Sequence, residues 1–297
     1  MRKRLLQLEK TSRLLEPDSG ERKHVRKKVI DYTENFIRNI EKLKAFEFTD
    51  EKGAALLDSP ISESGTNIEE ALKLIEENVD HQGLNPASGG HLGYIPGGGI
   101  YYSALGDYLA DITNRYAGIF FAGPGAVRME NQLIRWIAEQ MGYPSKAAGN
   151  LSSGGSLANL MGIVTARDAK KINSKNVRRS VIYLSTQAHH SVDKAIRIAG
   201  LNECIIRHVE LDERWRIKAA SLETLIKKDK VKGLNPFLVI ASAGTTDTGA
   251  IDPLDAIADI TAKYKLWYHV DAAYGGFFAL TAEGKKKLKG MERSDSL

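Results

Sequence analysis

Apolar residues in the second half of the chain form short continuous runs, and stretches of helical periodicity separate them. The runs cover residues 180–185, 203–209, 236–243 and 266–271, and each has the length and composition of a buried strand. Helical stretches fall at about 156–172, 191–199, 219–229 and 253–264, and in the last of these Asp252 suits the cap and Pro253 the first turn. Apolar strands that alternate with helices predict an α/β domain, with a mostly parallel sheet covered by helices on both faces.

The first eighty residues or so have a helical pattern instead. One apolar stripe with spacings of three and four predicts an amphipathic helix (Val25, Val29, Tyr32, Phe36, Ile40 and Leu43). Thr66 and Glu69 have the spacing of a capping box at the start of another helix. Residues 82–100 are rich in glycine and predict a loop, and a further helix that carries Met129 and Met141 ends near Gly142. We therefore expect a helical arm over residues 1–85 and a main domain over residues 86–297.

Composition excludes several classes of protein. The chain has 297 residues and one cysteine, Cys204, which excludes an internal disulfide and fits a reducing, cytoplasmic setting. No apolar run is long enough to cross a bilayer, and charged residues interrupt the N-terminal leucines where a signal peptide needs an unbroken segment. Residues 1–28 hold ten Lys and Arg against four Asp and Glu, which gives them a net charge of +6. The whole chain has a net charge of +5, so the remaining residues carry about −1. No aromatic residues are interleaved with these charges, so we expect a solvated helical face and neither a nucleic-acid nor a membrane partner.

Candidate chemistry gathers where the predicted strands end, because ligands of open α/β sheets bind beyond the carboxyl ends of the strands. The first candidate is the small-residue stretch 151–160, in which Gly154, Gly155 and Ser156 precede a helix whose N-terminal N–H groups can bind an anion. The stretch lacks the lysine of a P-loop and is neither G-x-G-x-x-G nor G-x-S-x-G. A tight turn with a serine cap remains the alternative.

The second candidate is residues 185–195, where His189 and His190 stand at a junction between strand and helix. Either histidine could stack on a flat ligand, cap the helix or have no role. Adjacent residues in extended chain point to opposite faces, and no third ligand has suitable spacing, so we expect no metal. The third candidate is the polar loop 242–253, which follows a buried strand.

The fourth candidate is Asp271, which ends an apolar strand and precedes two alanines. An unpaired buried carboxylate is costly, so the position predicts a cationic partner. A flat ligand with a phosphate at one end and a protonated ring nitrogen at the other would engage all four candidates. Pyridoxal phosphate (PLP) is such a ligand, and its ring acts as an electron sink when the nitrogen keeps its proton.

Four motifs in this order resemble the group II PLP-dependent decarboxylases, which include aromatic-amino-acid, glutamate, histidine and sulfinoalanine decarboxylases: SSGGSLANL, AHHSV, GTTDTGAID and HVDAAYGG. The resemblance covers about residues 85–297, and it implies a fold-type-I large domain, a PLP cofactor and a homodimer that acts on an amino acid. It also implies a role for each matching residue. Gly154, Gly155 and Ser156 would bind the phosphate, His189 would stack on the ring, and Thr246 would lie near the carboxylate. Asp271 would pair with the ring nitrogen, Ala273 would lie beneath the ring, and Tyr94 and Pro96 would line the substrate pocket.

One feature departs from the family pattern. The family's Schiff-base lysine follows a segment like ERSDSL in a His-Lys pair, and no such pair follows Leu297 here. Lys285, Lys286, Lys287 and Lys289 are expected on an exposed basic helix, where a lysine is not desolvated as a nucleophile must be. We expect decarboxylation of an L-amino acid by an intact protein. The alternatives are an inactive fragment that at most binds PLP or a partner subunit, a related PLP-dependent lyase, and, as a minor reading, a protein that binds nucleic acid or membranes through its basic N-terminus.

Overall fold

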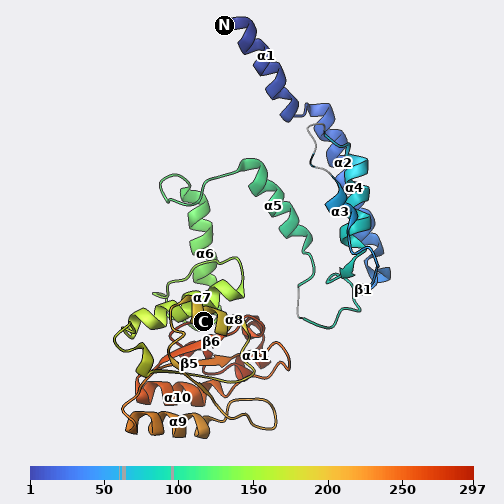
Figure 1. The fold of residues 1–297 in the computed structure, drawn as a ribbon. Helices are drawn as coiled ribbons and strands as arrows, with labels where there is room; N and C mark the ends of the chain where they lie inside the picture. The colour runs from blue at the N-terminus through green and yellow to red at the C-terminus, as the bar shows by residue number, and fades with distance from the viewer. Residues whose placement is uncertain (60, 62–64, 95–96) are drawn as a thin grey trace. The chain divides into compact units, whose positions relative to one another are not determined.

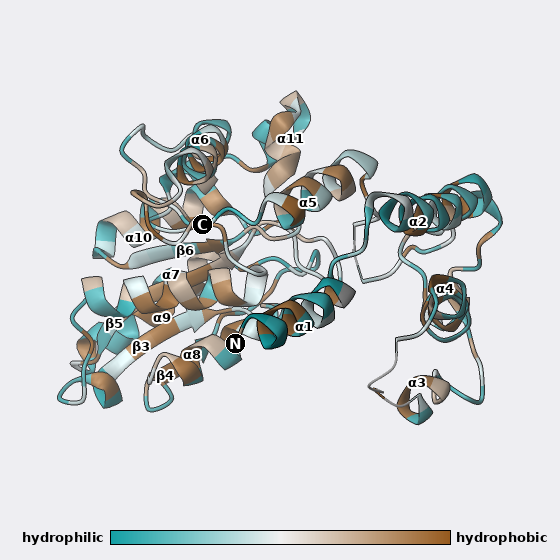
Figure 2. Cartoon of the chain, turned by 90° about the horizontal axis from the view of Figure 1, so that it is seen from above, coloured by the Kyte–Doolittle hydropathy of each residue, from teal (hydrophilic) through white to brown (hydrophobic). Residues whose placement is uncertain are grey.

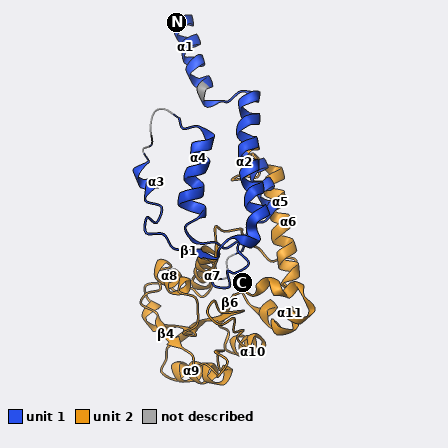
Figure 3. Cartoon of the chain, turned by 90° about the vertical axis from the view of Figure 1, so that its right-hand side faces the viewer, with its two compact units in different colours: residues 1–111 blue, residues 112–297 orange. Residues whose placement is uncertain are grey.

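The computed structural model describes residues 1–59, 61, 65–94 and 97–297, which form two compact units. The first unit comprises residues 1–111 and the second residues 112–297 (Figures 1 and 3). The boundary expected from sequence, between residues 85 and 86, lies inside the first unit, and the domain assignment built on it stays a prediction.

The first unit is mainly helical. Its regular helices are α1 (Arg2–Ser12), α2 (Ser19–Asn39), α3 (Ala55–Asp58) and α4 (Ile68–Ile75), and α5 (Tyr101–Thr113) runs across the division. Short 3₁₀ turns cover Arg13–Leu15 and Ile40–Lys42, and a π-helical turn covers Glu76–Asp80. The strands β1 (Phe46–Glu47) and β2 (Gly83–Leu84) pair antiparallel, so the glycine-rich segment expected to be a loop begins with a strand.

The predicted apolar stripe lies mostly on α2, which packs against α4, and its last two residues, Ile40 and Leu43, follow the end of this helix. Tyr32 and Phe36 are half-buried there, whereas Val29 is exposed. Figure 2 shows hydrophilic residues along much of α2, as an amphipathic helix requires. The cap of α4 differs from the prediction: Asn67, not Thr66, caps the helix, and its side chain accepts a hydrogen bond from the Glu70 N–H. Asparagine and threonine both cap helices through a side-chain oxygen that accepts a backbone N–H, so the sequence alone does not show which of these two adjacent residues is the cap.

The second unit has alternating helices and strands. In chain order they are α6 (Pro124–Gln140), α7 (Gly155–Ala169), β3 (Ser180–Leu184), α8 (Ser191–Ile198), β4 (Ile205–His208), α9 (Ala219–Val231), β5 (Asn235–Ser242), α10 (Leu254–Tyr264), β6 (Trp267–Asp271) and α11 (Ala282–Lys287). Three 3₁₀ segments lie among the described residues of this unit, at Val177–Arg179, Gly276–Leu280 and Met291–Arg293. None of the helices in the described ranges has the length and apolarity needed to cross a membrane.

The four strands form one parallel sheet in the order β4-β3-β5-β6. The chain goes from β3 outward to β4 and then returns to the other side of β3 for β5. The carboxyl ends of β3 and β5 therefore flank the point where the strand order reverses, which is where open α/β sheets bind ligands.

Helices cover both faces of this sheet, because alternate residues of each buried strand point to opposite sides. On one face Val181 and Tyr183 of β3 pack in a cluster with residues of α9 and α10. On the other face Ile182 and Leu184 pack in a second cluster with residues of α7 and α8. The predicted α/β class with a doubly covered parallel sheet is confirmed.

Asp252 has a different role from the helix cap that its position suggested. It is buried, and its two carboxylate oxygens accept hydrogen bonds from the backbone N–H groups of Ile217 and Ser242, at 2.7 and 2.8 Å. Burial raises its pKa from 3.8 to about 6, because the charged form is desolvated. Asp252 thus ties the loop before α9 to the end of β5, and Pro253 is the residue at the N-cap of α10.

Candidate active site

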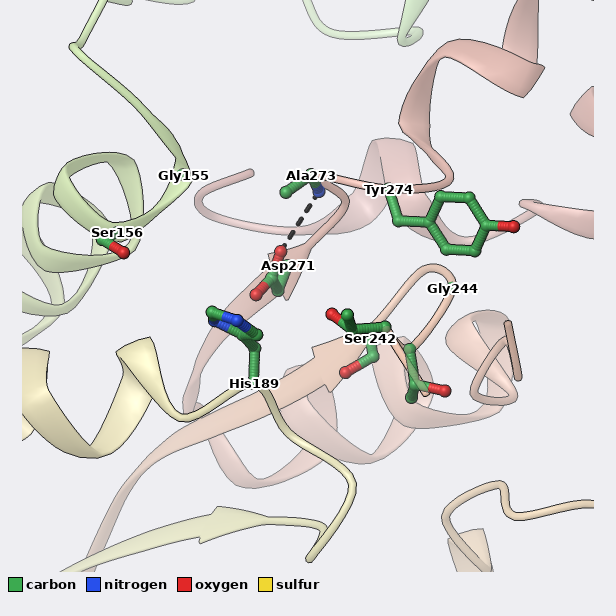
Figure 4. Close-up of a pocket in the computed structure, with 10 residues that line it drawn as sticks. Gly155, Ser156, His189, Ser242, Gly244, Asp271, Ala273 and Tyr274 are labelled. Atoms are coloured by element: carbon green, nitrogen blue, oxygen red, sulfur yellow. Dashed lines mark hydrogen bonds between the residues drawn. The ribbon is translucent and has the colours of Figure 1, made fainter. Parts of the chain in front are cut away.

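Side chains from three strand ends and one helix N-terminus surround a single pocket in the second unit. It encloses about 190 Å³, and Figure 4 shows the Asp271 carboxylate beside His189, with Ser156 on one side and Tyr274 on the other. The pocket is lined by Gly155, Ser156, His189, Ser242, Gly244, Thr245, Thr246, Asp271, Ala273 and Tyr274. The structure therefore brings together all four sequence stretches in which candidate chemistry was predicted.

The N-terminus of α7 forms one wall of the pocket. Gly154 is its N-cap residue and provides no side-chain cap, and no acidic residue lies in the first turn. The first N–H groups of a helix have no partner within the helix and carry the positive end of its dipole, so this end can bind an anion. A Cβ atom at Gly155 would stand 3.4 Å from the Cβ of Ala273, and a larger side chain there would fill the pocket.

Asp271 ends β6, lines the same pocket and is half-buried. One of its oxygens, Oδ1, accepts the backbone N–H of Ala273 at 3.1 Å, and Oδ2 accepts the Asn159 amide Nδ2–H at 2.8 Å. Within the described residues no lysine or arginine forms an ion pair with it. Both of these partners are neutral, so neither supplies the carboxylate with a positive charge.

His189 follows β3, and its ring is held by the start of α8. Its Nδ1 lies 2.7 Å from the Ser191 hydroxyl and accepts the Ser191 backbone N–H at 3.2 Å. Because the backbone N–H can only donate, Nδ1 is the unprotonated nitrogen and Nε2 carries the proton. His190 is exposed and is absent from the pocket lining, although the two rings lie 4.0 Å apart between centroids.

The loop after β5 supplies a polar wall. Thr245 is buried, and its hydroxyl lies 2.7 Å from that of Thr248, which holds the loop in a tight turn. Thr246 lines the pocket and is exposed. Ser242 lines the pocket as well, at the end of β5.

Most, but not all, of the predicted site residues meet here. Gly155, Ser156, His189, Thr246, Asp271 and Ala273 line the pocket, and Gly154 caps the helix behind it. Tyr94 belongs to the first unit, is exposed and has a positive φ of 60°, so its predicted place in a substrate pocket stays a prediction. Pro96 lies outside the described residues. The roles assigned to all of these residues likewise remain predictions.

Sequence reasoning missed several residues of the site. Ser242, Gly244 and Thr245 lie in the loop that was singled out, but nothing separated them from their neighbours. Tyr274 directly follows the alanine pair and was treated as part of the motif. Asn159 stands inside the predicted helix after the glycine turn, with no signal that its amide would reach Asp271.

No lysine is among the residues that line the pocket. Lys285, Lys286 and Lys287 are exposed on α11, as predicted. Lys287 pairs with Glu283 at 2.8 Å, and Lys289 pairs with Asp255 at 2.8 Å. These pairings direct both ammonium groups to acidic side chains that are not part of the pocket.

The pocket thus offers an anion-binding helix end and a carboxylate without a cationic partner in the described part of the chain. A protonated Nε2 of His189 and a polar threonine loop complete the walls. A ligand that fits this set has an anionic group at one end and a cationic group at the other.

The family model for the pyridoxal-dependent decarboxylase conserved domain matches residues 51–297. The chain is 37% identical over 241 residues to an aromatic-L-amino-acid decarboxylase of Bacillus atrophaeus, covering 81% of this chain and 50% of the relative. It is 31% identical over 247 residues to an acidic amino acid decarboxylase of Xenopus tropicalis, covering 82% of this chain and 48% of the relative.

Among solved structures, the fold is similar to that of Oryza sativa TDC with PLP and tryptamine. The TM-score is 0.85 at 25% identity, over 94% of this chain and 60% of that one. The chain spans about half the length of the curated relatives it matches. With a family model that matches most of its residues and a pocket built from the motifs of that family, the chain belongs to the pyridoxal-dependent decarboxylase family.

Proposed function

We propose that this chain forms the PLP-binding part of an enzyme that decarboxylates an L-amino acid. The observation that carries the proposal is the position of Asp271, whose carboxylate faces the same pocket as an uncapped helix N-terminus and has only neutral partners. PLP has the matching charges, because its phosphate is anionic and its ring nitrogen is basic.

Each end of the pocket has one task in this proposal. The N–H groups of Gly155 and Ser156 at the start of α7 bind the phosphate, where the helix dipole adds to their hydrogen bonds. Asp271 holds the proton on the pyridine nitrogen through a charge-assisted hydrogen bond, which is shorter and stronger than a neutral one. When bound, PLP withdraws electrons from the substrate's reacting carbon through its protonated ring.

The remaining walls orient the ring and the substrate. His189 would cover one face of the ring, and its Nε2–H would be left as a hydrogen-bond donor because Nδ1 contacts Ser191. Ala273 leaves room on the opposite face, and Thr246 lies close to the carboxylate end. The substrate class supported here is an L-amino acid. A related PLP-dependent lyase would use the same residues. The two activities are distinguished by their products, because decarboxylation releases CO2 and the lyase reaction releases an aldehyde without CO2.

A second proposal concerns this stretch of chain by itself. Since the pocket lining includes no lysine, we infer that residues 1–297 bind PLP without covalent attachment and are catalytically inactive alone. The charge pattern of the pocket supports binding, and the ion-paired Lys287 and Lys289 supply no nucleophile to it.

We also propose that the intact enzyme is a homodimer. The exposed aromatic and aliphatic residues of α5 support this, with Tyr102 82% and Ile112 69% exposed. Large apolar side chains that are exposed together on one helix are typical of an interaction surface. Light scattering after gel filtration tests the proposal, and a monomer at micromolar concentration would contradict it.

The central test is equilibrium dialysis of the purified chain against PLP, with Asp271→Asn as the variant. This substitution keeps the shape of the side chain and removes its charge, so we expect PLP affinity to fall at least tenfold, about 1.4 kcal/mol. Lys289→Ala is the matched control, because it changes a charge outside the pocket, and it should bind as the wild type does. Equal affinity in Asp271→Asn and the wild type would overturn the proposal. For the intact enzyme, CO2 trapped from an amino acid supports decarboxylation, and aldehyde without CO2 supports the lyase.

A further inference from the structure

A connected series of buried polar side chains lies directly behind the pocket. At its centre is Asn159, in the second turn of α7, which is 5% exposed. Its side-chain amide contacts three partners: Asp271 Oδ2 at 2.8 Å, Ser191 Oγ at 3.2 Å and His269 Nε2 at 3.1 Å. A buried amide with all its main partners in place is rigid, so this one group links three elements, β6, α8 and α7.

The partners determine which way the amide faces. An ionised carboxylate only accepts hydrogen bonds, so the amide NH₂ faces Asp271 and its oxygen faces His269. The oxygen of an amide only accepts, and therefore His269 carries a proton on Nε2. The second N–H of Asn159 points at the Ser191 hydroxyl oxygen.

His269 holds the amide oxygen from behind. It is 1% exposed, and burial lowers its pKa from 6.5 to about 4, so the ring is neutral at pH 7. Its Nδ1 lies 2.9 Å from the hydroxyl of Ser296, which in turn accepts the indole N–H of Trp267 at 2.9 Å. The Ser296 hydroxyl proton is therefore directed to Nδ1, and the backbone of Ser296 is held next to β6 by the Val270 N–H at 3.0 Å.

A glycine gives this imidazole its place. Gly162 lies one turn beyond Asn159 in α7 and is buried. A Cβ atom added there would stand 2.6 Å from the Cε1 of His269, closer than real contacts allow. Glycine costs a helix interior about 1 kcal/mol relative to alanine. Its presence here is explained by the ring that packs on it.

The other branch reaches the second ring of the pocket. Ser191 accepts from Asn159, so its own hydroxyl proton is free to be donated to His189 Nδ1, 2.7 Å away. The Ser191 backbone N–H points at the same nitrogen. Asn159 therefore takes part in placing both the carboxylate of Asp271 and the imidazole of His189.

We propose that Asn159 is a positioning residue that orients Asp271 and His189 together, with its own amide oriented by His269 and Ser296. The inference rests on the proposed function, because it takes Asp271 and His189 to be the groups that contact the PLP ring. Without the amide, Asp271 Oδ2 loses its side-chain donor and can turn away from the ring nitrogen. At the same time the Ser191 hydroxyl loses the donor that directs its proton to His189.

The test uses two readouts, and one of them needs no cofactor. The variant is Asn159→Ala, and the matched control is Asn202→Ala, at an exposed asparagine after α8. Equilibrium dialysis gives the PLP affinity, with circular dichroism to verify folding. Imidazole ¹⁵N spectra of the seven histidines, assigned with His189→Gln and His269→Gln, give the protonated nitrogen of each ring.

We expect both His189 and His269 in the wild type to carry the proton on Nε2 at pH 7. Asn159→Ala should weaken PLP binding at least tenfold and give His189 a mixture of both tautomers, while Asn202→Ala changes neither. Unchanged affinity together with an unchanged His189 spectrum in Asn159→Ala would overturn the proposal and leave the proposed function intact. So would a wild-type His189 protonated on Nδ1.

A wild type that fails to bind PLP refutes the proposed function instead, and the His189 spectra then decide the positioning role by themselves. If Asn159→Ala does not fold, Ser191→Ala tests one branch, because it leaves the contact of Asn159 with Asp271 in place. Its His189 should lose the fixed tautomer, and a spectrum equal to that of the wild type would contradict the proposed branch.

Discussion

Acidification should destabilise this protein through the buried imidazole of His269. Its pKa is lowered by burial from 6.5 to about 4, whereas in the unfolded chain it stays near 6.5. Between these values the unfolded state binds a proton that the folded state does not. The stability from the neutral ring is therefore complete above pH 6.5 and is lost as the pH falls toward 4.

The size of the effect follows from the two pKa values. One pH unit corresponds to about 1.4 kcal/mol when only one state binds the proton. At pH 5, which is about 1.5 units below the unfolded value, His269 should have lost about 2 kcal/mol of its contribution at pH 7. Such a loss is a large fraction of the stability of an ordinary domain.

The assay is urea unfolding of the wild type and His269→Gln at pH 5, 6 and 7. Glutamine does not titrate and keeps a donor for Asn159. The wild type should lose about 2 kcal/mol relative to the variant between pH 7 and pH 5. His208→Gln, at an exposed residue that ends β4, should change this pH dependence by less than about 0.5 kcal/mol. Parallel pH profiles for the wild type and His269→Gln would refute the reasoning that the ring is buried and neutral.

Four other substitutions test separate parts of the structure. Gly162→Ala should lower the unfolding free energy by about 1–3 kcal/mol, because the new methyl overlaps the His269 ring, and equal or higher stability would contradict that packing. Asp252, whose pKa is raised to about 6, should have the opposite pH dependence: the wild type should lose about 2 kcal/mol relative to Asp252→Asn between pH 4 and pH 7 in urea titrations, and a gain would disprove it. Lys287→Ala and Lys289→Ala should each bind PLP within twofold of the wild type by dialysis, and a tenfold loss would assign either lysine to the pocket.

Much of the second unit could be predicted because its strands are apolar on both faces. The run 236–243 became β5 and the run 266–271 became β6, each within a residue or so. A strand buried on both faces is a continuous apolar run, so its two ends can be recognised in a single sequence where polar residues begin. The same burial places the next polar residues at the strand ends, which is why the candidate stretches meet at one pocket.

Helix ends and buried polar contacts were harder to predict. At α4 two adjacent capping residues compete, and the sequence does not show that Asn67 accepts from Glu70. Asp252 has the chemistry of a cap, but two backbone donors from distant segments bind its carboxylate instead. Such partners come together only in the folded chain.

Asn159 shows most clearly that contacts between residues far apart in the sequence cannot be predicted from local patterns. Its residue type is ordinary in a helix after a glycine turn, and its partners Ser191 and Asp271 lie 32 and 112 residues away in the sequence. No local pattern encodes such contacts. The need for glycine at position 162 could not be predicted either, because it comes from the His269 ring that packs against it in the folded chain.

The central claim is that Asp271 keeps the ring nitrogen of bound PLP protonated. The most direct measurement is the ¹⁵N chemical shift of the pyridine nitrogen in labelled PLP bound to this chain at pH 8. We predict a protonated nitrogen in the wild type and an unprotonated one in Asp271→Asn. An unprotonated nitrogen in the wild type, or the same shift in both proteins, would contradict the account.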